Sequence, residues 1–351
     1  MSQLAQRLKH ARLMRGLSLQ DLSDHLDNRV SRQALHKYEK EQVEPNNVII
    51  QNIADALDLK PDYFYRDHAV ELEEISFRKL SRLSKKEQNR IVETARDFLE
   101  RYLELEQIIG AQPHVKNPLQ ELNIISKKDV ENAAQLLRDE WQLGIDPLYN
   151  VLELLEDCGI KIIELDGEES IDAFSSWINN SVPVIVLNKE KKDSPDRYRF
   201  NALHELGHLF LNIDHMNHRK QESLCHHFAG AMLLDKRAVE SEVGLKRKKV
   251  SLQELASLKR QYGISIQAIA TRLKELGIMS EGAYRDFYRF INRNNLRKNE
   301  SKLAVYQGEE QALRFDQLIG QALAEEYISI SKAAALKNQH LNEFRRNFLL
   351  G

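Results

Sequence analysis

The stretch Pro-Asp-Arg-Tyr-Arg-Phe-Asn-Ala-Leu-His-Glu-Leu-Gly-His-Leu-Phe-Leu, residues 195–211, contains the pentapeptide His204-Glu205-Leu206-Gly207-His208. Pro195 is a favourable first residue of a helix, and the apolar residues that follow predict a buried helix to about residue 211. Side chains four residues apart project from the same face of a helix, so His204 and His208 can reach one metal ion. Two bare histidines in a buried helix would be costly without such a partner.

Glu205 lies on the adjacent strip of the same helix, where it can reach a water on the ion without being a ligand. Zinc lowers the pKa of a bound water to about 7, and a glutamate can then take its proton as the water attacks a peptide carbonyl. This is the chemistry of the H-E-x-x-H pattern. Gly207 costs about 1 kcal/mol relative to alanine in a helix, which is easier to accept if something approaches closely there.

A catalytic zinc needs a third protein ligand and one open position. Glu222, at the start of the next predicted helix, would complete a His₂Glu site. Asp214 is a rival, because it continues the pattern H-E-x-x-H-x-x-x-x-x-D, although that pattern normally has glycine where Leu211 stands. Weaker rivals are His215, His218, His226 and, for a soft metal, Cys225.

Residues 199–235 resemble the ImmA/IrrE family of metallopeptidases, whose H-E-L-G-H helix is followed by E-x-x-A-N-x-F-A. The second motif stands here as Glu222-Ser223-Leu224-Cys225-His226-His227-Phe228-Ala229, with Cys225 and His226 in place of alanine and asparagine. The resemblance extends from about Trp177 to about Ile278. It implies that His204, His208 and Glu222 bind zinc and that Glu205 is the general base.

The surroundings of the motif predict a mixed domain. Strand-like runs cover 160–165, 171–178 and 183–187, and helical patterns include 221–234 and a closing pair at 252–262 and 265–276, which we interpret as structural. The fold class is therefore α+β and mostly helical. We expect a zincin-like peptidase domain with a small sheet at 121–290 and a helical C-terminal region of unknown role at 291–351.

Residues 3–66 predict five short helices and resemble the Xre/Cro-type helix-turn-helix family, so we expect a DNA-binding domain at 1–68. In that motif the second helix of the pair enters the major groove of double-stranded DNA. Here it would begin near Ser31 and present Arg32, Gln33, His36 and Lys37. Gln33 could read adenine, and Arg32 could read guanine or bind phosphate. Other candidates for phosphate contact are Arg12 and Lys40.

A long amphipathic helix at 85–109, ended by Gly110, lies within a connecting segment at 69–120. Pro113 and Pro118 bracket a linker after it. Its stripe of Ile91, Phe98, Tyr102 and Leu105 is too apolar for a solvated spacer. We expect it to pack against the peptidase domain or a second copy of itself, so a homodimer is possible.

The composition limits which partners and which cellular compartment the protein can have. The net charge of −2 means that any affinity for DNA must come from a local basic face. Two distant cysteines do not make a disulfide framework and favour a reducing cytoplasm. We find no signal peptide and no run of 18 apolar residues, so we expect no membrane span.

Two functions fit these patterns. The first is a DNA-binding regulator with zinc endopeptidase activity against a protein substrate; the resemblance implies a repressor or a similar regulator. The alternative is a non-catalytic transcriptional regulator or antitoxin-like protein, in which the peptidase-like domain binds a partner or senses a ligand. An intact Glu205 favours the first, because a binding domain has no need of the base.

Overall fold

The computed structural model of the chain describes residues 2–66, 83–111, 115–166, 171–179, 181–297 and 299–348. Contacts between Cα atoms divide the chain into two compact units. We name the units by their place in the sequence. The outer unit contains residues 1–112 and 315–351, and the central unit contains residues 113–314. The sequence predicted four segments with boundaries at 68, 120 and 290. The division into two units does not test these boundaries, so they stay predictions. Parts of the segment expected at 69–120, including Pro113, lie outside the described residues.

The first part of the outer unit is a small helical domain with its own core. Its elements are α1 (Gln3–Met14), α2 (Leu19–His25), α3 (Arg32–Glu39), α4 (Asn47–Ala56) and the 3₁₀ helix η1 (Pro61–Tyr65). The sequence sets where α2 and α3 begin: Ser18 and Ser31 each accept a hydrogen bond from a backbone N–H in the first turn of the following helix. The predicted five helices are thus present.

The long helix α6 (Lys85–Ile109) ends at Gly110 in a left-handed conformation, as its sequence indicates. From Phe98 onward, its apolar stripe is buried against helices of its own unit, α15 (Arg314–Ala324), α16 (Ile330–Leu336) and α17 (Leu341–Phe348), and the helix also packs on α1. Tyr102 and Leu105 lie in one core with Phe315 and Phe344. Our expectation that this stripe would meet the peptidase domain or a second copy was wrong, so it gives no support for a dimer.

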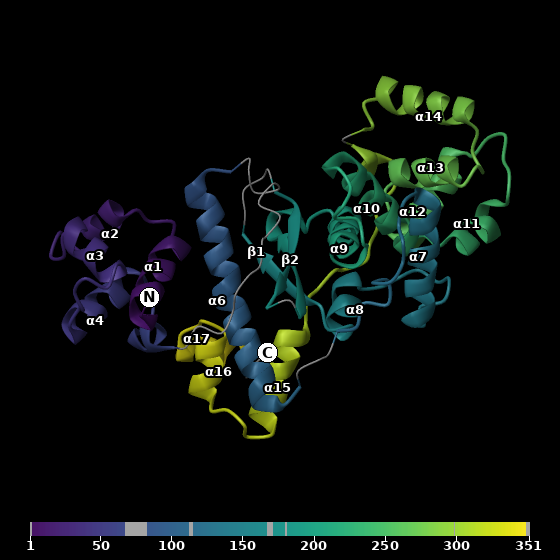
Figure 1. Ribbon diagram of the computed structural model, residues 1–351. Helices are drawn as coiled ribbons and strands as arrows, with labels where there is room; N and C mark the ends of the chain where they lie inside the picture. The colour runs from purple at the N-terminus through teal and green to yellow at the C-terminus, as the bar shows by residue number, and fades with distance from the viewer. Residues whose placement is uncertain are drawn as a thin grey trace. The chain divides into compact units, whose positions relative to one another are not determined.

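The central unit is mostly helical around a small mixed sheet, which confirms the predicted fold class (Figure 1). Its strands are β1 (Lys161–Leu165), β2 (Ala173–Ile178) and β3 (Val182–Asn188). Strand β3 is central, parallel to β1 and antiparallel to β2. The helical elements are α7 (Lys127–Glu140), α8 (Val151–Asp157), η2 (Lys189–Lys191), α9 (Pro195–Phe210), α10 (His218–Leu233), α11 (Lys236–Val243), α12 (Leu252–Tyr262), α13 (Ile266–Glu275), α14 (Glu281–Arg293) and η3 (Glu300–Lys302).

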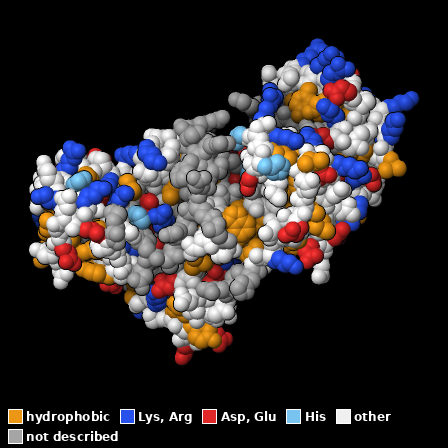
Figure 2. Space-filling view, viewed as in Figure 1, with side chains coloured by type: hydrophobic (Ala, Val, Ile, Leu, Met, Phe, Trp, Pro, Cys, Tyr) orange, Lys and Arg blue, Asp and Glu red, His pale blue; other side chains and the backbone are white. Residues whose placement is uncertain are grey.

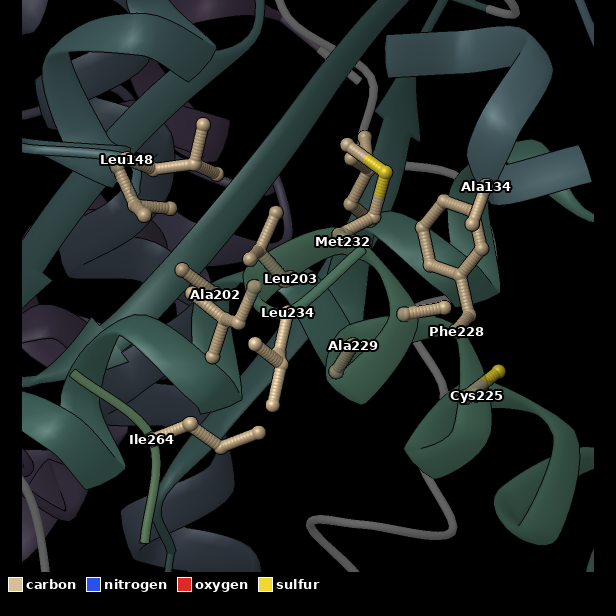
Figure 3. Close-up of a cluster of buried hydrophobic side chains, with 14 of the residues drawn as sticks. Ala134, Leu148, Ala202, Leu203, Cys225, Phe228, Ala229, Met232, Leu234 and Ile264 are labelled. Atoms are coloured by element: carbon tan, nitrogen blue, oxygen red, sulfur yellow. The ribbon is translucent and has the colours of Figure 1, made fainter. Parts of the chain in front are cut away.

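The core of the central unit surrounds α9, which packs against β2 and β3 and also against α10 (Figure 1). Figure 3 shows how Ala202 and Leu203 of α9 lie among side chains of α10 such as Ala229 and Met232. Helices α12 and α13 also contribute buried residues to this core, in line with a structural role. Among the described residues, no helix combines the length and apolar character needed to cross a membrane.

Candidate metal centre

Helix α9 carries the pentapeptide on its inner face. His204 is 6% exposed and Glu205 is 3% exposed, and the side chain of His208 is 20% exposed. The Nε2 atoms of the two histidines are 3.2 Å apart. The predicted helical spacing therefore brings the two imidazoles close together. His208 is the more open of the two to solvent.

Glu222 lies in the second turn of α10 and faces both histidines. Its carboxylate oxygens are 3.3 Å from Nε2 of His204 and 3.1 Å from Nε2 of His208. In a tetrahedral zinc site with bonds of about 2.0–2.1 Å, neighbouring donor atoms lie about 3.3–3.4 Å apart. Each histidine faces a different oxygen of the carboxylate, at a spacing close to that between two corners of such a site.

His226 lies one turn after Glu222 and belongs to a second, overlapping group. Donor atoms of His204, Glu222 and His226 all lie within 4.8 Å of one another, so this group could hold a metal ion. The rings of His204 and His226 are 4.4 Å apart, and His226 also stacks on Phe200 at 5.8 Å. His226 is therefore a further candidate ligand beside the set that contains His208.

Three other candidate ligands, Asp214, His215 and His218, are exposed, whereas Cys225 is buried. Asp214 lies in the turn after α9, where its backbone carbonyl accepts a hydrogen bond from Gln221. His218 is half exposed, with Nε2 3.5 Å from a carboxylate oxygen of Glu222, and His215 is exposed. Within the described part of the chain, the group of mutually close donors is His204, Glu222 and His226; it contains none of these three, and it does not contain His208.

Glu205 has a partner that sequence reasoning missed. The hydroxyl of Ser175, on β2, donates a hydrogen bond of 2.9 Å to its carboxylate. Alternate residues of a strand share a face, and Ala173, on the same face as Ser175, belongs to the core that contains α9. The sequence could have indicated Ser175 as a polar residue on a buried strand face. Its hydrogen bond to Glu205, however, depends on how β2 packs on α9.

Comparison with protein families agrees with this geometry. Residues 155–274 match the IrrE N-terminal-like domain family, and residues 8–64 match a helix-turn-helix family. The chain carries an IrrE N-terminal-like domain after an Xre-type helix-turn-helix domain. Searches of curated proteins and of solved structures find no match for the chain.

The packing of α10 on α9 explains why a glycine stands at position 207. A Cβ atom placed on Gly207 would lie 3.3 Å from Cα, Cβ and Sγ of Cys225. Helix α10 therefore approaches α9 closely at this point, one turn after Glu222. The close approach helps to bring the carboxylate within reach of both histidines.

A charge network beside the centre ties α10 to two other helices of the domain. Nδ1 of the buried His227 lies 2.7 Å from Glu275 on α13, and Nε2 lies 3.0 Å from Glu131 on α7. Both partners are carboxylates, so both nitrogens donate and the imidazole is charged. Burial lowers the pKa of His227, but the two carboxylates outweigh burial and raise it. Arg272 completes the network through two hydrogen bonds to Glu131.

A cavity of about 480 Å³ opens next to the metal group. Its lining includes Glu222 and His226, and its walls come mainly from α10 and α13. Phe200 and Ala268 give it an apolar part, and exposed Arg219 adds a cation.

The helix-turn-helix domain places the predicted DNA-reading residues on one exposed surface. Ser31, Arg32, Gln33, His36 and Lys37 are all exposed on or just before α3. This agrees with groove contact, which stays a prediction for each residue.

One predicted phosphate contact was wrong. Arg12 is only 8% exposed, and its guanidinium donates hydrogen bonds of 2.7 and 2.8 Å to the buried carboxylate of Glu39. It also donates to the backbone carbonyl of Leu17. Arg12 therefore holds α1 against α3 and has no free face for DNA.

Proposed function

We propose that the protein is a DNA-binding regulator whose IrrE N-terminal-like domain is a zinc-dependent endopeptidase. His204, His208 and Glu222 are the proposed zinc ligands. The observation that carries the proposal is their mutual spacing of 3.1–3.3 Å, which leaves one corner of a tetrahedron for water or substrate. An open corner is typical of a catalytic zinc rather than a structural one.

The proposed reaction is hydrolysis of a peptide bond. A bound zinc would supply a Lewis acid that lowers the pKa of its water to about 7 and polarises the carbonyl. Glu205 takes the proton of the attacking water and passes it to the leaving amine. Ser175, through its hydrogen bond to Glu205, holds this carboxylate in one orientation.

The surroundings of Glu205 suit an extended peptide. Among the described strands, β2 is at an edge of the sheet, and it packs on α9. An edge strand can pair with an extended chain through its free backbone groups. The cavity beside Glu222 would take one side chain of that peptide. Because the chain also carries a DNA-binding domain, we propose that the substrate is a repressor or another regulatory protein.

The metal assignment can be tested by metal analysis. The purified protein should hold about one zinc per chain, and His204→Ala, His208→Ala and Glu222→Ala should each lose it. His215→Ala and Asp214→Ala are matched controls, because both residues are exposed nearby, and they should retain zinc. Full retention in Glu222→Ala would refute this ligand set, and loss in Asp214→Ala would make Asp214 the third ligand.

The catalytic assignment needs a variant that keeps the metal. Glu205→Gln preserves the size of the side chain and removes the base, so zinc content and DNA binding should persist while proteolysis stops. New protein N-termini in cells under inducing conditions should appear with the parent and not with Glu205→Gln, and neighbouring genes should stay silent in the variant.

The alternative is a non-catalytic regulator that uses the domain to bind a partner or sense a ligand. It predicts that Glu205→Gln behaves like the parent, whereas a strain with residues 31–40 disrupted does not. Identical N-termini and identical gene expression in parent and Glu205→Gln would therefore reject the peptidase proposal and leave this one standing.

DNA reading has its own test. Gln33→Ala should relax sequence preference, whereas Lys37→Ala should weaken binding to all sequences alike and reduce its salt dependence. If the protein dimerises, the operator should be an inverted repeat with half-sites about 34 Å apart or a multiple of that. Unchanged footprints in both variants would show that α3 is not the groove-reading helix.

A further inference from the structure

Helix α14 follows the matched part of the IrrE N-terminal-like domain and carries a regular row of arginines. Arg285, Arg289 and Arg293 lie on the helix at intervals of four residues, and Arg297 follows just after its end. All four are exposed. Residues four apart on a helix lie on one face about 6 Å apart along the axis. The helix therefore presents a line of evenly spaced positive charges.

The opposite face of α14 is already packed. Ala283, Tyr284 and Phe287 lie against the core of the central unit, and Ile291 is fully buried. This packing fixes the helix in place, so its arginines project from a firm support.

A second basic segment lies beside the start of α14. The backbone N–H of Arg247 donates a 2.9 Å hydrogen bond to the carbonyl of Ile278, and Arg247 forms a parallel bridge with Met279. The lysines on either side, Lys246, Lys248 and Lys249, are exposed. The basic residues of the loop between α11 and α12 therefore form one positively charged surface with the arginines of α14.

We name residues 245–249 and 281–297 the basic ridge. Figure 2 shows Lys and Arg side chains along the top of the view, where Figure 1 has α14. The ridge contains eight Lys and Arg residues but only two carboxylates, whereas the whole chain has a net charge of −2. Among the described residues, Arg289 pairs with Asp286 and Arg247 with Glu254, while the ridge's other six cations have no ion pair. Such a local excess of unneutralised charge calls for an anionic partner.

We propose that the basic ridge binds the phosphate backbone of double-stranded DNA. The same chain carries a helix-turn-helix domain, so duplex DNA is a partner that this chain already meets. Arginine and lysine contacts to phosphate add affinity without reading sequence. The central unit thus adds sequence-independent affinity for DNA to the groove contacts of the helix-turn-helix domain.

The salt dependence of DNA binding by the full chain tests this proposal. The variant Arg285→Gln/Arg293→Gln removes two ridge charges, and the control Lys189→Gln/Arg260→Gln removes two exposed charges elsewhere in the central unit. The probe is a 30-base-pair duplex of arbitrary sequence. Each phosphate contact contributes about 0.9 to the slope of log K against log salt, so the ridge variant should lose about 2 from the slope and the control should lose none.

Two further measurements keep the result interpretable. Trp fluorescence during unfolding shows that both variants fold, because Trp141 and Trp177 lie in the central unit. Binding to phosphatidylserine vesicles tests the rival anionic partner. Equal slopes for the parent and the ridge variant would overturn the proposal, as would a loss of vesicle binding with DNA binding unchanged.

Discussion

The contact between α9 and α10 at Gly207 makes a quantitative prediction. Replacing glycine by alanine inside a helix stabilises it by about 1 kcal/mol. At Gly207, however, the new Cβ would lie 3.3 Å from three atoms of Cys225, so α10 must move away by a few tenths of an ångström. Overpacking of this kind costs about 1–3 kcal/mol. We therefore expect Gly207→Ala to be neutral or to destabilise the central unit by up to about 2 kcal/mol.

Gly230 on α10 is the matched control. A Cβ there would find its nearest neighbour, Cδ of Arg272, at 4.0 Å, which is ordinary contact. Gly230→Ala should therefore gain about 1 kcal/mol, and the two variants should differ by about 1–3 kcal/mol. Denaturant unfolding followed by Trp fluorescence measures this difference in the central unit, where both tryptophans lie.

The same displacement should weaken zinc binding. Glu222 lies three residues before Cys225 on α10, and metal–ligand distances tolerate only about 0.2 Å. Gly207→Ala should therefore bind zinc at least about tenfold more weakly, whereas Gly230→Ala should not. If Gly207→Ala is as stable as Gly230→Ala and binds zinc as tightly as the parent, the helix approach does not set the geometry of the centre.

Three more outcomes are expected. Ser175→Ala removes a hydrogen bond to a charged group, worth about 1.5–3 kcal/mol, so kcat/KM for peptide cleavage should fall about 10- to 100-fold with zinc content unchanged; an unchanged rate would exclude the positioning role. Burial raises the pKa of Glu131, but hydrogen bonds from His227 and Arg272 outweigh burial and hold it at about 2. The ionised form is thus favoured on folding, and the resulting stability should be lost as pH falls from about 4.5 towards 2; Glu131→Gln should flatten that part of the unfolding profile, and an identical profile would contradict the network's role. Arg12→Leu leaves a buried carboxylate unpaired and should destabilise the helix-turn-helix domain by about 3–5 kcal/mol, seen as faster hydrogen exchange in α1 and α3; unchanged exchange would refute it.

Local patterns predicted the parts of the site that depend on a single element. The spacing of His204 and His208 follows from helical periodicity, and the three strands follow from short apolar runs. Glu222 was identified by its place in a motif, and spacing alone left Asp214 open. The structure separates these two through the orientation of α10 relative to α9, which no local pattern encodes.

Predictions failed where the partner of a side chain lies far away in sequence. Arg12 is a residue type that commonly contacts phosphate, but it forms a buried hydrogen bond with Glu39, which lies 27 residues away in the sequence. The stripe on α6 is apolar enough for a dimer, but the chain covers it with helices more than 200 residues later. Ser175 was missed for the same reason, because its role appears only when β2 packs on α9.

The division of the chain has a consequence for biosynthesis. Residues 1–112 and 315–351 form one unit, so the polypeptide begins this unit, makes the whole central unit, and then returns to finish the first. Domains generally fold as the ribosome delivers them, N-terminal parts first. The core between α6 and α15 to α17 must wait for residues 314–348 to emerge, with Tyr102 and Leu105 uncovered meanwhile. During translation, these side chains of α6 are therefore exposed apolar surface that a chaperone can cover.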